Sequence, residues 1–168
     1  MRKTTSGFTL VELLIVIVVI AILAAITMVA YGGIQDKAND VAVQSDLANY
    51  AKKAEIFKID NGHYPTASST DLASLQITPT KNSYYEDDYN LYYATIGPDY
   101  DVYGFTARSK SGTSFFYTSA KGPGSLGERS MGSGAAYEVI DASDPVAAGR
   151  ALNYGYHKIN KEWANWTE

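Results

Sequence analysis

An unbroken apolar segment near the N-terminus constrains this chain of 168 residues more than any other feature. Residues 13–26 carry no polar side chain, and the apolar character continues past Thr27 to Tyr31. About 20 apolar residues in a helix, each rising about 1.5 Å, span the ~30 Å hydrocarbon core of a bilayer. Because Arg2 and Lys3 precede the segment, the N-terminus is expected in the cytoplasm and the rest of the chain outside it. The sequence therefore predicts one membrane-spanning helix.

One carboxylate, that of Glu12, stands at the start of this apolar segment. A charge within a membrane helix is costly and marks a candidate functional site that needs a partner. A secretory signal peptide is one alternative, since the small residues Ala21, Ala24 and Ala25 lie near the end of the segment. A plain single-pass anchor is the second alternative. Neither of these alternatives gives the acid a role.

The residues around this acid resemble a class III signal, the prepilin sequence of type IV pilins and of the pseudopilins of type II secretion. The resemblance rests on the run Gly7-Phe8-Thr9-Leu10-Val11-Glu12, on the short basic leader before it and on the apolar helix after it. It implies that a prepilin peptidase cuts after Gly7 and methylates the new N-terminus at Phe8, so that the apolar segment is retained. It also implies that Glu12 pairs with the N-terminal ammonium of a neighbouring subunit in a filament.

Elementary electrostatics supports the pairing that this resemblance implies for Glu12. Opposite charges attract strongly in a medium of low dielectric constant, and an unpaired carboxylate there is penalised. Glu12 would therefore fix the axial register at which a new subunit docks, while Phe8, Leu10 and Leu13 pack in the filament core. These four residues and the cleavage position Gly7 are the candidate site residues, and no catalytic residue is expected.

Residues 32–61 are expected to form an amphipathic continuation of the helix. One apolar stripe at helical spacing is formed by Val43, Leu47, Tyr50, Ala54 and Phe57. The pair Gly32 and Gly33 is a candidate bend, because each glycine weakens a helix by about 1 kcal/mol relative to alanine. The alternative, a helix that runs straight through the pair, stays open. Asn61 and Gly62 tolerate the left-handed conformation of a helix C-terminus, so the helix is expected to end there.

Residues 62–168 are expected to form an α+β head. Three segments rich in aromatic and β-branched residues are separated by short turns and predict an antiparallel meander of strands. These segments are Tyr89–Ile96, Val102–Ala107 and Thr113–Ser119. Gly62-His63-Tyr64-Pro65 resembles the G-x-Y-P segment that follows the long helix in many pilins and pseudopilins. From residue 121 onward glycine and small polar residues dominate, which predicts a mostly irregular wrap, with one further strand near residues 154–159.

A cluster of tyrosines precedes and enters the first expected strand. Its members are Tyr84, Tyr85, Tyr89, Tyr92 and Tyr93. Alternation along a strand would bury only some of them. The preferred interpretation places them in the core and on the sheet faces, and the alternative leaves several of them for subunit contacts or for adhesion to surfaces.

The fold class expected is thus α+β, with a long N-terminal helix packed on a small antiparallel sheet and an irregular C-terminal region. Four parts follow from it: a leader, 1–7, removed by the peptidase; a transmembrane and filament-core helix, 8–31; an amphipathic helix, 32–61; and the head, 62–168. Before assembly the chain is expected in the cytoplasmic (inner) membrane, spanning it once with the N-terminus in the cytoplasm. After assembly it is expected in an extracellular pilus or a periplasmic pseudopilus.

The amino-acid composition limits which classes of partner and cofactor the chain is expected to bind. The net charge of −4 argues against a nucleic-acid partner held by bulk charge, although it does not exclude a local basic patch. The absence of cysteine excludes disulfides and thiolate metal sites, and His63 and His157 lack the spacing of a zinc pair. No cofactor is expected, and a solvated acidic turn is preferred over calcium for one group of acids. That group is Glu86, Asp87, Asp88, Asp99 and Asp101.

The function expected is therefore that of a structural subunit of a type IV pilus-like filament, acting in adhesion, motility or uptake. Its expected partners are further copies of the chain, the prepilin peptidase and methyltransferase, the inner-membrane assembly platform, and membrane lipid before assembly. One alternative is a type II secretion pseudopilin, which the lack of a D-P-W-G segment disfavours. The other is a membrane-anchored binding module that never polymerises.

Overall fold

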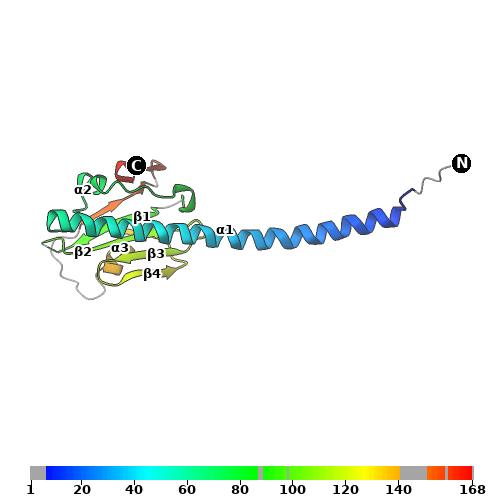
Figure 1. The fold of residues 1–168 in the computed structure, drawn as a ribbon, viewed down its shortest axis with the longest axis horizontal. Coiled ribbons are helices and arrows are strands. Elements are labelled where there is room, and N and C mark those ends of the chain that lie inside the picture. Colours follow the sequence, from blue (N-terminus) through cyan, green and yellow to red (C-terminus); the bar gives the residue numbers. More distant parts are fainter. Residues whose placement is uncertain (1–6, 87–88, 98, 141–150, 158, 168) are drawn as a thin grey trace. The chain divides into compact units, whose positions relative to one another are not determined.

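A computed structural model describes residues 7–86, 89–97, 99–140, 151–157 and 159–167 of the chain (Figure 1). The chain divides into two compact units between Asp36 and Lys37. The longer helices and strands are α1 (Leu10–Asn61), α2 (Ser69–Ser74), β1 (Leu91–Ile96), β2 (Val102–Arg108), β3 (Ser114–Thr118), β4 (Gly122–Gly127), α3 (Ser133–Ile140) and β5 (Ala151–Tyr154). The short elements are η1 (Lys81–Ser83), β6 (Tyr156–His157), β7 (Glu162–Trp163) and η2 (Asn165–Thr167).

Helix α1 continues through the pair Gly32 and Gly33, where the sequence analysis considered either a bend or a continuous helix. Both Gly32 and Gly33 are helical, and a Cβ added to either one would meet no atom within 4 Å. The helix ends at Asn61, which confirms the predicted end. Gly62 then adopts the left-handed conformation with φ of +81°, and its N–H donates to the carbonyl of Lys58 at 2.8 Å. A glycine takes this conformation without steric cost, so the stop signal lies in the residue type.

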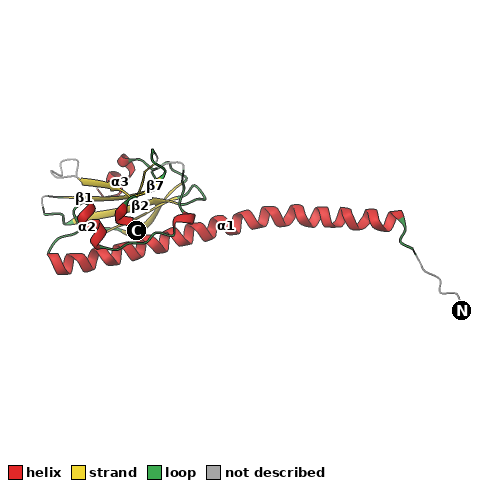
Figure 2. Ribbon diagram, turned by 90° about the horizontal axis from the view of Figure 1, so that it is seen from above, coloured by secondary structure: helices red, strands yellow, loops and turns green. Residues whose placement is uncertain are grey.

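The head is built on a five-stranded antiparallel sheet with the strand order β4-β3-β2-β1-β5. The meander β1-β2-β3 is the one predicted from the three aromatic segments, and Figure 2 shows these strands beside the second half of α1. Phe105 of β2 lies opposite Tyr93 on β1 and opposite Tyr117 on β3. Successive aromatic pairs in register therefore line the face of the sheet toward the helix.

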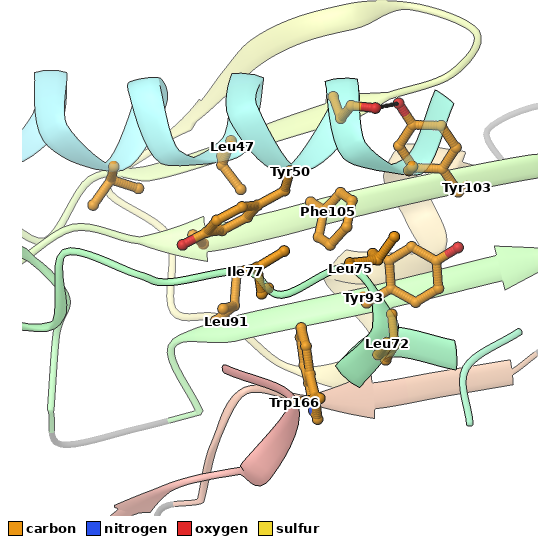
Figure 3. Packing of buried hydrophobic residues seen from close by; sticks show 14 of the residues in the cluster. Leu47, Tyr50, Leu72, Leu75, Ile77, Leu91, Tyr93, Tyr103, Phe105 and Trp166 are labelled. Atoms are coloured by element: carbon orange, nitrogen blue, oxygen red, sulfur yellow. Dashed lines mark hydrogen bonds between the residues drawn. The ribbon is translucent and has the colours of Figure 1, made fainter. Parts of the chain in front are cut away.

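The main core lies between that sheet face and the predicted apolar stripe of α1. Val43, Leu47, Tyr50 and Ala54 are buried, and Phe57 packs against them half-buried. Figure 3 shows Leu47 and Tyr50 extending from α1 toward the sheet, and the rings of Tyr50 and Phe105 lie 5.6 Å apart. Aromatic pairs at this separation add to the stabilisation that burial supplies. The helical period of the sequence thus identified the helix face that the sheet covers.

The opposite face of the sheet is covered by α3, which the sequence did not predict. A second core forms there from Tyr92, Ala94, Met131, Ala135 and Ala136. Together with β4 and β5, this helix makes the region beyond residue 121 more regular than the irregular wrap expected. A strand was expected near residues 154–159, and the short β6 lies there, paired with β7. The strand that joins the main sheet is β5, just before it, and it pairs with β1.

Strand β4 forms from a glycine-rich sequence in the region for which an irregular wrap was predicted. A Cβ on Gly124 would lie 2.1 Å from the Cζ of Phe116, so the ring of Phe116 on β3 occupies the place of a side chain. Pro123 lacks an amide donor, and an edge strand tolerates that loss. The glycine therefore serves a cross-strand contact that only the partner strand reveals.

A buried carboxylate joins α1 to the segment before the sheet. Asp46 Oδ2 accepts hydrogen bonds from the backbone N–H of Thr80 at 2.6 Å and from the hydroxyl of Tyr84 at 3.0 Å. The hydroxyls of Tyr84 and Tyr50 lie 3.3 Å apart, which extends the network into the core. Burial raises the pKa of both Tyr50 and Tyr84 far above that of a free tyrosine. Both hydroxyls therefore stay protonated and able to donate at physiological pH.

The tyrosine cluster belongs mainly to the core, as the preferred interpretation held. Tyr84, Tyr92 and Tyr93 are fully buried, whereas Tyr85 and Tyr89 are half-buried. The hydroxyl of Tyr93 donates to the carbonyl of Pro65 at 2.7 Å, so this fully buried side chain has a polar partner. Tyrosine supplies both a large apolar ring and a tether for the irregular segments around the sheet.

Replacing Asp46 with alanine is expected to lower the free energy of unfolding of the head by about 2–4 kcal/mol, because the buried hydroxyl of Tyr84 and the part-buried N–H of Thr80 lose their acceptor. Urea unfolding of the full chain in detergent micelles, followed by near-ultraviolet circular dichroism, measures this change. Asp60→Ala, at an exposed position of the same helix, is the control and should shift stability by less than about 0.5 kcal/mol. Equal stabilities of the two variants would contradict the role given to Asp46.

Candidate functional site

The predicted assembly residues lie on an apolar surface that none of the described residues covers. Every described side chain from Gly7 to Met28 is exposed. Phe8 is 85% exposed, Leu10 82% and Leu13 60%. Within the described residues, α1 is the one helix long and apolar enough to cross a membrane, and its apolar stretch is not buried at all. A contiguous apolar surface of this kind requires lipid or another protein to cover it.

The candidate cleavage position precedes the helix. Gly7, Phe8 and Thr9 are not helical, and α1 begins at Leu10. Gly7 and Phe8 are both exposed, so their peptide bond lies on an accessible stretch of chain. A peptidase needs an accessible, locally open backbone, and the chain meets this requirement without unfolding its helix.

Glu12 takes part in a reciprocal cap at the start of α1. Its Oε2 accepts hydrogen bonds from the backbone N–H of Thr9 at 2.8 Å and from the Thr9 hydroxyl at 2.7 Å. The N–H of Glu12 donates in return to Oγ1 of Thr9 at 3.2 Å. Thr9 and Glu12 therefore form a capping box, the arrangement in which N-cap and N3 side chains satisfy each other's backbone donors.

The sequence analysis missed this cap, although the signal for it is present. A threonine followed three residues later by glutamate, directly before an apolar run, is the signature of a capping box. The cap gives Glu12 a partner within its own chain. Because the side chain remains exposed, the carboxylate can keep the cap and still meet a cation from outside. The single chain thus holds an exposed, oriented carboxylate at the head of an apolar helix.

The acidic residues considered for calcium are only partly described. Asp87 and Asp88 lie outside the described residues, so the site cannot be assembled from them. Across the ranges that the structure describes, no three His, Cys, Asp or Glu residues lie close enough to hold a metal ion. Asp101 lies against Gly97, where its Oδ1 would be 2.5 Å from an added Cβ, so this carboxylate packs against a turn.

Comparison with known proteins covers both halves of the chain. Residues 2–28 match the family model of the prokaryotic N-terminal methylation motif, and residues 30–117 match that of type II secretion system (T2SS) protein G. The matched ranges stop at residue 117. They therefore take in α1 and the strands β1 and β2, while β4, α3 and the C-terminal strands lie beyond them.

Individual relatives fall into two groups. The type II secretion system core proteins G of Klebsiella michiganensis and Escherichia coli are 34% and 38% identical to the chain, over 52% and 48% of its length. These alignments span 63% and 56% of the two relatives, which is less than two thirds of each. The type IV wide pilus major component PilA4 of Thermus thermophilus is 33% identical over 68% of the chain and 81% of that protein.

Replacing Glu12 with alanine is expected to fray the first turn of α1 by about 1 kcal/mol, because the N–H of Thr9 loses its acceptor. Glu12→Gln is the matched variant, since an amide oxygen preserves the cap. Amide hydrogen exchange at residues 9–12, measured by nuclear magnetic resonance in detergent micelles, should quicken several-fold in Glu12→Ala and stay near the parent rate in Glu12→Gln. Unchanged exchange rates in both variants would show that the Glu12 side chain does not stabilise the first turn.

Proposed function

Because the chain belongs to the family that contains the type II secretion protein G and the type IV pilins, we propose that it is a structural subunit of a type IV pilus-like filament. The observation that carries the proposal is a fully exposed apolar helix with a single, exposed carboxylate at its head. The role is structural rather than catalytic. The prepilin motif and the apolar helix fit a protein that is anchored in a membrane before it assembles.

Maturation would begin at the open segment before α1. We place the cut after Gly7 and the methyl group on the new N-terminus at Phe8. A prepilin peptidase and methyltransferase would carry out both steps. The cut removes the leader, 1–7, with its two cations Arg2 and Lys3, and creates a single ammonium group. The apolar helix, 8–31, stays on the protein and holds it in the cytoplasmic membrane, with its N-terminus on the cytoplasmic side.

The side chains of the apolar helix determine what drives the subunit from the bilayer into a filament. Lipid chains and neighbouring apolar helices cover its leucine, isoleucine and valine side chains about equally well, so burial of apolar area hardly distinguishes the two environments. The carboxylate of Glu12 does distinguish them, because it is costly in lipid and is neutralised by an ammonium group in a filament. We infer that Glu12 pairs with the Phe8 ammonium of a neighbouring subunit, while Leu10 and Leu13 pack in the filament core.

A pseudopilin of type II secretion is the second candidate, and the match of residues 30–117 to protein G favours it. The pilin is preferred because the alignment with the wide pilus component covers more of the chain, 68% against 52% for the first protein G. The two differ in location, since a pilus is extracellular and a pseudopilus is periplasmic. Recovery of the chain in filaments sheared from the cell surface supports the pilus, and its retention in the periplasm supports the pseudopilus.

Substitution of Gly7 with valine is expected to block the cut, because a β-branched side chain then stands at the scissile bond. Mass spectrometry should find the parent chain starting at methylated Phe8 in sheared filaments, and the variant starting at Met1 in the membrane fraction only. Gly32→Ala is the control, since a Cβ there meets no neighbouring atom in the chain, and it should be cut normally. Filaments whose subunits retain Met1 would overturn the proposed maturation, and a chain that is cut but never forms filaments would indicate a membrane-anchored module.

The charge of Glu12 can be separated from its role as a cap. Glu12→Ala and Glu12→Gln are both expected to be cut after Gly7 and yet to be lost from sheared filaments at least tenfold, although only the alanine variant loses the cap. Glu86→Gln, at an exposed position of the head, should enter filaments at the parent level. Normal incorporation of Glu12→Gln would show that the cap suffices and that no charge pair is needed.

A further inference from the structure

The C-terminal segment builds one side of a groove of about 610 Å³. That side is formed by residues 153–157 and 160–166, and the other side by Ser69 and Lys81, which lie within the region that matches protein G. Figure 1 shows the C-terminal segment running beside α2. The family match ends at residue 117, so the C-terminal side of the groove lies beyond the matched region.

An aromatic wall of the groove is held rigidly. The ring of Trp163 stands nearly perpendicular to that of Tyr84 at 5.3 Å and at 66° to that of Tyr156 at 5.5 Å. Trp166 is buried beneath, where its indole N–H donates to the carbonyl of Tyr154 at 3.0 Å, and Figure 3 shows it beside Leu72 in the core. Trp163 itself stays half-buried. One tryptophan thus anchors the segment, and the other presents a fixed flat surface.

Polar groups of both kinds surround that surface. Asn160 Nδ2 donates to Glu162 Oε1 at 2.9 Å, which orients a carboxylate at the rim, and both side chains are exposed. Asn165 is also exposed and adds an amide, which can donate and accept. The ammonium of Lys81 lies 5.8 Å from the centre of the Trp163 ring, on a long side chain that can move aside. Acceptors, donors and a flat apolar surface therefore meet in one groove.

This combination excludes several ligand classes. The described lining residues of the groove carry one carboxylate, one ammonium and the imidazole of His157, which is not the strong excess of positive charge that phosphate or nucleic acid requires. The polar rim is equally unsuited to a lipid chain. A pyranose ring with equatorial hydroxyls matches it, because each flat face of such a ring carries only C–H groups while its edge carries hydroxyls that both donate and accept. The face would lie on the aromatic ring and the edge on the amides and the carboxylate.

We propose that this groove binds a gluco-configured oligosaccharide, with one pyranose face on Trp163 and its equatorial hydroxyls on Glu162 and Asn165. The site lies wholly within the head, so binding needs no filament. In the filament proposed above it would recur on every subunit, and repetition strengthens weak individual binding to a glycan-covered surface. The inference therefore gives the proposed filament a class of surface to adhere to, while its test stays independent of assembly.

Both tryptophans of the chain line this groove, so intrinsic tryptophan fluorescence reports on it as well as on the core contacts of Trp166. The full chain, held in a detergent without sugar groups, is titrated with cellotriose and with chitotriose, and the galactose and mannose trisaccharides serve as comparators. The expected result is a saturable change in emission and reduced quenching by iodide with at least one gluco-configured sugar. Each comparator carries an axial hydroxyl in place of an equatorial one, which removes a hydroxyl from the ring edge that would face Glu162 and Asn165, so their binding is expected to be at least fivefold weaker.

Substitutions at the rim avoid the risk that Trp163→Ala unfolds the segment. Glu162→Gln and Asn165→Ala, both at exposed positions, are expected to weaken sugar binding at least fivefold with unchanged near-ultraviolet circular dichroism. Glu128→Gln is the control, because Glu128 is exposed, lies beyond residue 117 and does not line the groove; this variant should bind as the parent does. Absence of saturable binding of either gluco-configured sugar at millimolar concentration, or binding that the rim variants leave unchanged, would overturn the proposal. If the parent chain binds no sugar and the rim variants also fail to enter filaments, the groove is a contact between subunits, and this result would overturn the proposal as well.

Discussion

A single carboxylate at the head of an apolar helix is the constraint on which the organisation of this protein depends. The apolar surface of α1 before residue 31 suits lipid and a packed helix bundle equally, so it cannot by itself direct the chain from one to the other. Glu12 makes the two environments unequal because its charge needs a cation. The cap with Thr9 satisfies part of the carboxylate at the helix start and holds it in a fixed position. Cutting after Gly7 would create the missing cation beside it.

The head solves a different problem, the stabilisation of a small sheet in a chain without cysteine. The second half of α1 covers one sheet face, and α3 covers the other. Tyrosine hydroxyls then tie loops to this framework, as Tyr93 does with Pro65 and Tyr84 with Asp46. Trp166 fixes the C-terminal segment in the same core. Aromatic packing and buried hydrogen bonds thus do here what a disulfide does in other small domains.

The predictability of these features depends on how local their physical causes are. The α1 stripe, its end at Asn61 and the three meander strands follow from periods and turn residues within a few positions, and all were predicted from the sequence. Strand β4 was not, because Gly124 is explained by the ring of Phe116 on another strand. Helix α3 and the pairing of β5 with β1 depend on distant partners in the same way. At the candidate site, Glu12 and the cleavage position after Gly7 were identified from the sequence. The cap was not predicted, although the spacing of Thr9 and Glu12 is the signature of a capping box.

The central claim is that the Glu12 carboxylate pairs with the Phe8 ammonium of a different subunit. Filaments assembled from two pools, one carrying ¹⁵N-phenylalanine and the other carrying ¹³C-glutamate at the side-chain carboxyl carbon, test it by solid-state nuclear magnetic resonance. A dipolar coupling between the Phe8 amine nitrogen and the Glu12 carboxyl carbon in the mixed filaments is the predicted result, because only contacts between subunits bring the two labels together. Mixed filaments in which the Glu12 carboxyl carbon shows no coupling to any labelled amine nitrogen would contradict it.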